Sequence, residues 1–118
     1  MDIKKINNKI AVIINSDGMG SAPKELSYLL IKNYLTLLNT EDRTPSYICM
    51  YGDGVKLACE ESPVLEELGT LEEKGAKIII CKTCLIYNKL LDKVRTGSIG
   101  TMLDIIDIQH NSTKLINL

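Results

Sequence analysis

The sequence predicts an α/β domain with a mostly parallel sheet. Short apolar runs rich in β-branched residues recur along the chain, and segments with helical periodicity lie between them. Continuous apolar runs are typical of strands covered on both faces, and alternation of strands with helices favours parallel pairing. The chain has 118 residues, so we expect one domain over residues 1–118.

The first expected elements are a strand at residues 9–15 and a helix at residues 24–38. The strand reads KIAVIIN, an apolar run too short for a helix. The turn SDGMGSAP follows it, and Pro23 suits the first turn of a helix. Leucines and tyrosines then recur at helical spacing over a wide apolar arc, so this helix is expected to pack on the sheet and on a second subunit.

The middle of the chain predicts two further strands with helices after them. A strand is expected at residues 45–52, a short helix within 54–62 and a longer helix at 62–74, which ends in a lysine and a glycine. The third strand is expected at residues 76–80, with a short helix at 85–91.

The last part of the chain predicts a weak fourth strand at residues 93–100 and a closing strand at 113–118. Between them, Thr101 and Asp104 have the spacing of a capping box, which predicts a helix running towards Gln109.

Composition excludes several classes of function. The net charge is −1 and acidic and basic residues are interspersed, so nucleic acid is not an expected partner. No apolar segment approaches the ~20 residues that span a bilayer, and the apolar run at residues 10–14 has no cleavage site after it. We therefore expect a cytoplasmic protein without a membrane helix, in which four cysteines are not a disulfide framework.

The most informative stretch is IIICKTCLIY, which places Cys81 and Cys84 where the third strand stops. Ligands gather at the carboxyl ends of parallel strands, so the loops at residues 16–21, 52–55 and 81–84 are expected to meet there. A helix start and the nearby Lys82 both favour thiolate over thiol. The spacing also allows one sulfur to attack a group bonded to the other.

Several roles for the two cysteines are open from the residues alone. They fit a dithiol pair, a sulfur nucleophile or small buried residues. Zinc is disfavoured because Cys49, Cys59 and His110 supply no second close pair, although a site between subunits is not excluded. We expect no metal and no cofactor.

Two glycine-containing turns are the expected pocket around these cysteines. In the first, Asp17 and Gly18 lie in SDGMGS. We expect a tight turn here in preference to a phosphate-binding loop, because the segment lacks the third glycine of a dinucleotide-binding fingerprint. In the second, Asp53 and Gly54 follow the second strand, and Cys59 lies further along. The two aspartates fit either a carboxylate pair or ordinary turn positions.

The segments NSDGMGSAPKELSYLLIKNYL, YGDGVKLACEESPVLEEL and LEEKGAKIIICKTCLIYNKLLDKVRTGSIGTMLDII together resemble the DsrE/DsrF-like family. More closely, they resemble the carboxyl-terminal domain of YedF-type proteins of sulfur or selenium metabolism. The most specific parts are the Asp53-Gly54-Val55 turn and the Cys-x-Thr-Cys-Leu segment, with Lys82 and Thr83 between the cysteines.

This resemblance implies a three-layer α/β/α fold with a five-stranded parallel sheet. It also implies sulfur relay, in which Cys81 accepts sulfane sulfur as a persulfide and Cys84 assists or resolves it. The implied partner is a sulfur-donor or acceptor protein, such as a separate TusA-like protein, and the implied assembly is a homo-oligomer. The alternatives are a dithiol oxidoreductase and a non-catalytic module that binds a small anion or nucleotide in the strand-end cleft.

Overall fold

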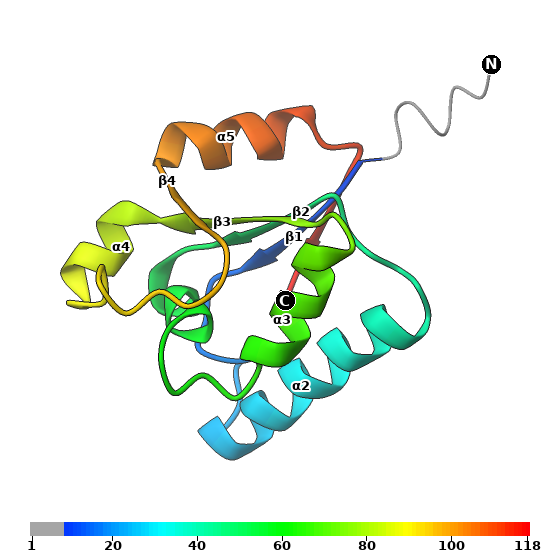
Figure 1. Cartoon of the computed structure of the whole chain (residues 1–118), viewed down its shortest axis with the longest axis horizontal. Helices are drawn as coiled ribbons and strands as arrows, with labels where there is room; N and C mark the ends of the chain where they lie inside the picture. Colours follow the sequence, from blue (N-terminus) through cyan, green and yellow to red (C-terminus); the bar gives the residue numbers. More distant parts are fainter. Residues whose placement is uncertain (1–8) are drawn as a thin grey trace.

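The computed structural model describes residues 9–118, which fold into a layered α/β arrangement (Figure 1). The elements in chain order are β1 (Ile10–Ile14), α2 (Lys24–Thr40), β2 (Tyr47–Met50), the 3₁₀ helix η1 (Gly52–Ala58), α3 (Leu65–Glu73), β3 (Lys77–Cys81), α4 (Lys82–Tyr87), β4 (Ser98–Gly100), α5 (Met102–Asn111) and β5 (Lys114–Asn117).

The five strands form one sheet in the order β4-β3-β2-β1-β5, and all four strand pairs are parallel. Helix α5 covers one face, while α2 and α3 cover the other (Figure 1). The predicted three-layer α/β/α fold with five parallel strands is therefore confirmed. Even the weakly predicted fourth strand is present, over three residues.

The core is built almost without aromatic rings, because the chain has neither Phe nor Trp. Ile13, Ile48 and Ile78, from the three central strands, are at most 1% exposed. Ile31 of α2 and Leu68 of α3 are fully buried in the same core. Full burial of such a side chain contributes roughly 1.5–3 kcal/mol, so branched aliphatic residues supply most of the stabilisation.

The predicted helix after the third strand begins three residues earlier than the sequence indicates. Helix α4 starts at Lys82, directly after Cys81, and Lys89 then takes a left-handed backbone conformation with φ 57°. A non-glycine residue rarely adopts that conformation, so the stop is hard to foresee. Both cysteines consequently lie on the strand-to-helix junction, with no separate loop between them and the helix.

Other boundaries follow their local signals. Thr101 and Asp104 form the predicted capping box at the start of α5. Gly75, at φ 112°, follows Lys74, the C-cap residue of α3. Helix α3 starts at Leu65, later than predicted.

Within residues 9–118, no helix has the length and apolar character needed to cross a bilayer. The basic segment at the amino end falls in residues 1–8, outside the described part of the chain.

Candidate functional site

The loops that follow β1, β2 and β3 meet at the carboxyl edge of the sheet, as the parallel topology predicts. Tyr51, directly after β2, donates its N–H to the carbonyl oxygen of Ile14 (3.2 Å). Gly52, the next residue, donates its N–H to Sγ of Cys84 (3.1 Å), which links the second loop to α4. These two hydrogen bonds join the end of β1, the start of η1 and the first turn of α4 at one edge of the sheet.

The turn at residues 52–54 depends on its two glycines. Gly52 has φ 59°, a conformation that other residues rarely adopt. A Cβ on Gly54 would lie 2.2 Å from the carbonyl oxygen of Ile14, because this residue packs directly against the end of β1. The glycines therefore allow the chain to bend tightly and present the Gly52 N–H to the neighbouring loop.

The two cysteines differ in accessibility. Cys81 is the last residue of β3 and the N-cap of α4, and it is only 1% exposed. Cys84 lies in the first turn of α4 and is half-buried. All four cysteines of the chain are free thiols. Cys84 is thus the member of the pair that solvent and a partner can reach.

The surroundings of Cys84 act on its thiol in opposite directions. Burial raises the pKa of Cys84, the Gly52 N–H lowers it, and the neighbouring Cys81 thiol and the Asp53 carboxylate raise it again. The net result is a raised pKa, opposite to the direction predicted from the helix start and Lys82. Helix α4 has only six residues, and Lys82 and Thr83 point into solvent, so neither compensates for burial.

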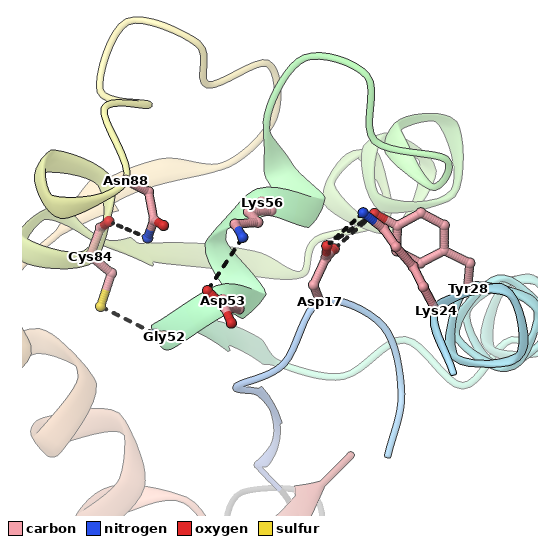
Figure 2. Close-up of polar contacts among 8 residues, drawn as sticks. All are labelled: Asp17, Lys24, Tyr28, Gly52, Asp53, Lys56, Cys84 and Asn88. Carbon is pink, nitrogen blue, oxygen red and sulfur yellow. Dashed lines mark hydrogen bonds and ion pairs between the residues drawn. The ribbon is translucent and has the colours of Figure 1, made fainter. Parts of the chain in front are cut away.

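A second polar cluster surrounds Asp17 after β1 (Figure 2). The Tyr28 hydroxyl donates to both carboxylate oxygens of Asp17, at 3.0 and 3.1 Å. The ammonium group of Lys24 lies 3.7 Å from the same carboxylate and 5.3 Å from the centre of the Tyr28 ring. Burial and the Asp17 carboxylate raise the pKa of Tyr28, so the hydroxyl keeps its proton and continues to donate.

The sequence leaves open whether Asp17 and Asp53 form a carboxylate pair, and the structure gives them separate cations. Asp53 pairs with Lys56, one turn along η1, at 3.5 Å. The amide of Asn88 donates to the carbonyl oxygen of Cys84 (2.8 Å; Figure 2). The carboxyl edge thus holds three small polar groupings and no joined dyad.

The SDGMGS segment is a tight turn, in agreement with the favoured prediction. Gly18 donates its N–H to Ser16 and Met19 donates to Ser27, so both amides are already engaged. A Cβ on Gly18 would lie 2.5 Å from Cβ of Ser27. The glycine therefore serves close packing of the turn on α2, and these amides are not free for a phosphate.

No hydrogen bond joins the remaining candidates to Cys84 in residues 9–118. Cys59 is buried and donates its thiol to the carbonyl oxygen of Val55 (3.3 Å). Cys49 is buried in the middle of β2, and His110 lies in the last turn of α5. Residues 9–118 contain no grouping of three or more His, Cys, Asp or Glu side chains suited to a metal ion.

Sequence reasoning did not identify Lys24, Tyr28, Lys56 and Asn88 as site residues. Three of them carried a usable signal: Lys24 and Tyr28 are four residues apart and share a helix face, and Asn88 stands four residues after Cys84. The carboxylate that joins Lys24 to Tyr28 comes from a different loop, so only the tertiary structure reveals the cluster.

Comparison with known proteins agrees with this architecture. The chain resembles the ychN protein of E. coli (17% identity, TM-score 0.69, covering 94% of this chain and 99% of that one). It also resembles MTH1491 of Methanobacterium thermoautotrophicum (16%, 0.69, 94% and 99%) and BT1422 of Bacteroides thetaiotaomicron (15%, 0.67, 100% and 100%), both described as proteins of unknown function. No curated protein matches.

At these identities the structures show a shared fold alone. The family model described as "DsrE/DsrF-like family" matches residues 4–118, nearly the whole chain. The chain therefore belongs to the DsrE/DsrF-like family, which is associated with sulfur relay.

Proposed function

We propose that this protein carries sulfane sulfur as a persulfide on its Cys81 and Cys84 pair and passes it to a partner protein. The observation that carries the proposal is the position of Cys84: half-buried, in the first turn of α4, with the Gly52 N–H directed at its sulfur. Such an N–H stabilises negative charge on a thiolate and on a persulfide anion alike.

The difference in burial supports an order of steps. The family resemblance implies Cys81 as the acceptor, but this thiol is only 1% exposed. A donor persulfide reaches Cys84 without any movement of β3, so we propose that Cys84 receives the sulfur and Cys81 assists. Family resemblance and burial thus favour different first acceptors, and single-cysteine variants distinguish them.

The proposed transfer needs no external oxidant. The Cys84 thiolate attacks the outer sulfur of a donor persulfide, the sulfur–sulfur bond of the donor breaks, and the donor thiolate leaves. A thiolate of the acceptor protein then attacks the outer sulfur on Cys84 and restores the Cys84 thiolate. Attack by Cys81 on the inner sulfur would instead release hydrosulfide and leave a Cys81–Cys84 disulfide.

The partners in this proposal are thiol proteins. We propose a TusA-like protein as the sulfur donor, the partner that the resemblance of the sequence to YedF-type proteins implies. A protein donor must bring its own sulfur to the half-buried Cys84, which the exposed positions of Lys82 and Thr83 beside it allow.

Intact-mass spectrometry tests the proposal. The protein is incubated with a cysteine desulfurase and cysteine, and wild type is expected to gain the mass of one sulfur atom. Cys84→Ser is expected to lose this gain, whereas Cys81→Ser keeps it, and Cys49→Ser serves as the matched control. Loss of loading in Cys81→Ser alone reverses the order of steps. Absence of added sulfur on wild type contradicts the proposal.

The dithiol oxidoreductase is the second candidate, favoured by the free thiols and closeness of Cys81 and Cys84. Its signature is a reversible loss of two hydrogen masses in a glutathione redox buffer, absent from either single serine variant. Formation of this disulfide without any sulfur loading would identify the oxidoreductase. Sulfur loading of Cys84 while Cys81 stays reduced identifies the relay protein.

A further inference from the structure

A cavity of about 780 Å³ lies between the C-terminal half of α2 and the strands β1 and β5. We infer that it binds a single-chain amphipathic carboxylate, such as a medium-chain fatty acid. The hydrocarbon chain lies on the sheet, and the carboxylate meets the cations of Arg43 and Lys114. This is a second site at the amino end of the strands, so the inference does not depend on sulfur transfer at the carboxyl edge.

The floor of the cavity is an apolar part of the sheet. Ile10 and Val12 of β1 are the register partners of Lys114 and Ile116 of β5. Residues two apart along a strand point to the same face, so these four side chains share one face of the sheet, and all four line the cavity. Three of them are aliphatic, which gives a hydrocarbon chain an apolar surface to cover.

The walls of the cavity come from α2 and from the loop that follows it. The helix contributes Tyr34, Leu37 and Leu38 from its last turns, and the loop contributes residues 41–45. This loop carries the chain from the end of α2 to β2 (Figure 1). The helix side is mainly aliphatic and the loop side carries charge, which is the division that an amphipathic ligand matches.

The end of α2 fixes the position of Arg43 at the cavity. Asp42 has φ 55°, and its N–H donates to the carbonyl oxygen of Asn39 (3.3 Å). The Arg43 N–H donates to the carbonyl oxygen of Leu38 (2.8 Å). These two bonds form a Schellman motif, in which the left-handed residue after the helix is an aspartate in place of the usual glycine. The main chain of Arg43 is therefore held in place before a ligand binds.

The charges around the cavity favour an anion. Arg43 and Lys114 form no ion pair with any residue of the described range 9–118. Asp42 is paired with Lys74 at 3.7 Å. Glu41 also lines the cavity and has no ion pair within the same range. Unpaired cations thus outnumber unpaired carboxylates, and a ligand carboxylate is attracted.

The donors at the cavity suit a carboxylate in particular. The guanidinium group of Arg43 can bind both oxygens of a carboxylate through two parallel hydrogen bonds. Tyr34 adds a hydroxyl, and burial raises the pKa of this hydroxyl, so it keeps its proton at neutral pH and can donate. A neutral apolar molecule of the same length would leave these donors without a partner.

The size of the cavity also favours a ligand with a hydrocarbon chain. Pockets for small molecules commonly measure about 300–1,000 Å³, and this one lies in the upper part of that range. A small inorganic anion would fill little of it and would leave the aliphatic floor in contact with water. A medium-length chain covers this floor, and each buried methylene group is expected to raise affinity about threefold to fourfold.

Calorimetric titration with decanoate, below the concentration at which it forms micelles, tests the inference. Saturable binding to wild type is expected. Arg43→Gln and Lys114→Gln should each weaken it about threefold to tenfold, because each removes one charge-assisted contact. Glu41→Gln should strengthen binding, because it removes a repelling charge. Lys89→Gln, an exposed cation outside the cavity, is the matched control, and thermal melts confirm that each variant is folded.

Ligand analogues separate the contribution of the chain from that of the carboxylate. Octanoate has two methylene groups fewer and should bind about tenfold more weakly than decanoate. Decanol keeps the chain and lacks the charge, so it should also bind about tenfold more weakly. Equal affinity for decanoate and decanol, or unchanged affinity in both Arg43→Gln and Lys114→Gln, overturns the inference. Absence of saturable binding overturns it as well.

Light scattering during the titration tests the other possible occupant, a second copy of the chain. Leu37 lines the cavity and is 58% exposed, so a neighbouring subunit is the competing explanation for this apolar surface. If the cavity is a ligand site, the mass of the particle stays constant as decanoate binds. Dissociation of an assembly in step with binding means that a second copy fills the cavity, and this result overturns the inference.

Discussion

At the scale of a single residue, the pKa of the Cys84 thiol depends on its burial and on neighbours from η1. The Gly52 N–H lowers its pKa, whereas burial and the Asp53 carboxylate raise it. Because the pKa is raised, a smaller fraction of Cys84 is thiolate at neutral pH than for a cysteine with the ordinary pKa. Because a thiolate with a higher pKa is a stronger nucleophile, the site combines lower abundance of the reactive form with higher reactivity.

Replacing Asp53 by asparagine is expected to lower the pKa of Cys84, because a negative charge near the thiolate is removed. Alkylation of Cys84 by iodoacetamide below its pKa should then be faster, by about two- to fivefold for a charge this exposed. Peptide mass mapping as a function of pH measures the rate at Cys84 alone. Asp42→Asn is the control, and an unchanged alkylation profile in Asp53→Asn contradicts the assigned role.

The burial of Cys49 predicts that the stability of the folded protein depends on pH. Burial in β2 raises the pKa of its thiol to about 11. The unfolded chain has the ordinary value of about 8.5, so its thiol loses the proton first as pH rises, and the unfolded state is then favoured. The contribution of Cys49 to the free energy of unfolding is complete below the pKa of its thiol in the unfolded chain. It is lost as pH rises towards the pKa of the thiol in the folded protein.

Urea denaturation of wild type and Cys49→Ala between about pH 8 and pH 11 checks this prediction. Other groups titrate in the same range, so the measured quantity is the difference between the two proteins. Wild type should lose more stability than Cys49→Ala across this window. Parallel pH profiles for the two proteins would show that the buried thiol has no such linkage.

Single residues also show how far sequence alone leads to the site. The position of Cys81 and Cys84 at the junction of strand and helix was predictable, because a β-branched run stops where they begin. The hydrogen bond from the Gly52 N–H to Sγ of Cys84 was not predictable. It requires that β2 and β3 be neighbours and that the second loop bend towards α4. The raised pKa was missed for a related reason: burial is a property of packing and has no local sequence signal.

At the scale of elements, the turn after β2 is a rigid support for the site. Gly54→Ala would place a Cβ 2.2 Å from the carbonyl oxygen of Ile14, so strand β1 or the turn must shift. We expect a loss of about 1–3 kcal/mol in the free energy of unfolding, typical of overpacking. Gly69→Ala is the matched control, because it lies within α3 with no atom within 4 Å of the new Cβ.

The control is expected to change stability in the opposite direction. Alanine is favoured over glycine inside a helix by about 0.5–1 kcal/mol, so Gly69→Ala should stabilise the protein. Thermal or urea unfolding measures both variants. Equal stability of Gly54→Ala and wild type would mean that the contact with Ile14 relaxes without cost.

Elements were easier to predict than their ends. The strands at 76–80 and 9–15 follow from continuous apolar runs, and the structure places β3 and β1 there. The start of α4 was misplaced because no strong capping residue precedes it and its end depends on Lys89 at φ 57°. Tertiary contacts fix such boundaries, and the local sequence only limits them.

At the scale of the whole molecule, apolar side chains remain exposed on the outer surface of α2. Leu29 and Leu37 are 57% and 58% exposed, in agreement with the wide apolar arc of this helix in the sequence. We propose that a second copy of the chain covers them, as the predicted homo-oligomer requires.

Light scattering of the purified protein is expected to show an assembly larger than a monomer. Leu29→Glu together with Leu37→Glu should convert it to a monomer, because two charges cannot be buried at an apolar contact without partners. Asn111→Glu, at an exposed position at the end of α5 on the other side of the sheet, adds a charge outside this surface and should leave the assembly intact. A monomeric wild type, or an unaffected double variant, rejects this surface as the contact.

The pairing of β5 with β1 has a consequence for how the chain matures. Ile10 and Lys114 are register partners, so β1, the first strand in the described part of the chain, pairs with β5, the last one. During synthesis on a ribosome, the hydrogen-bonding edge of β1 stays open until residues 114–117 have left the exit tunnel. The unfinished chain therefore presents an apolar strand to chaperones and to other nascent chains.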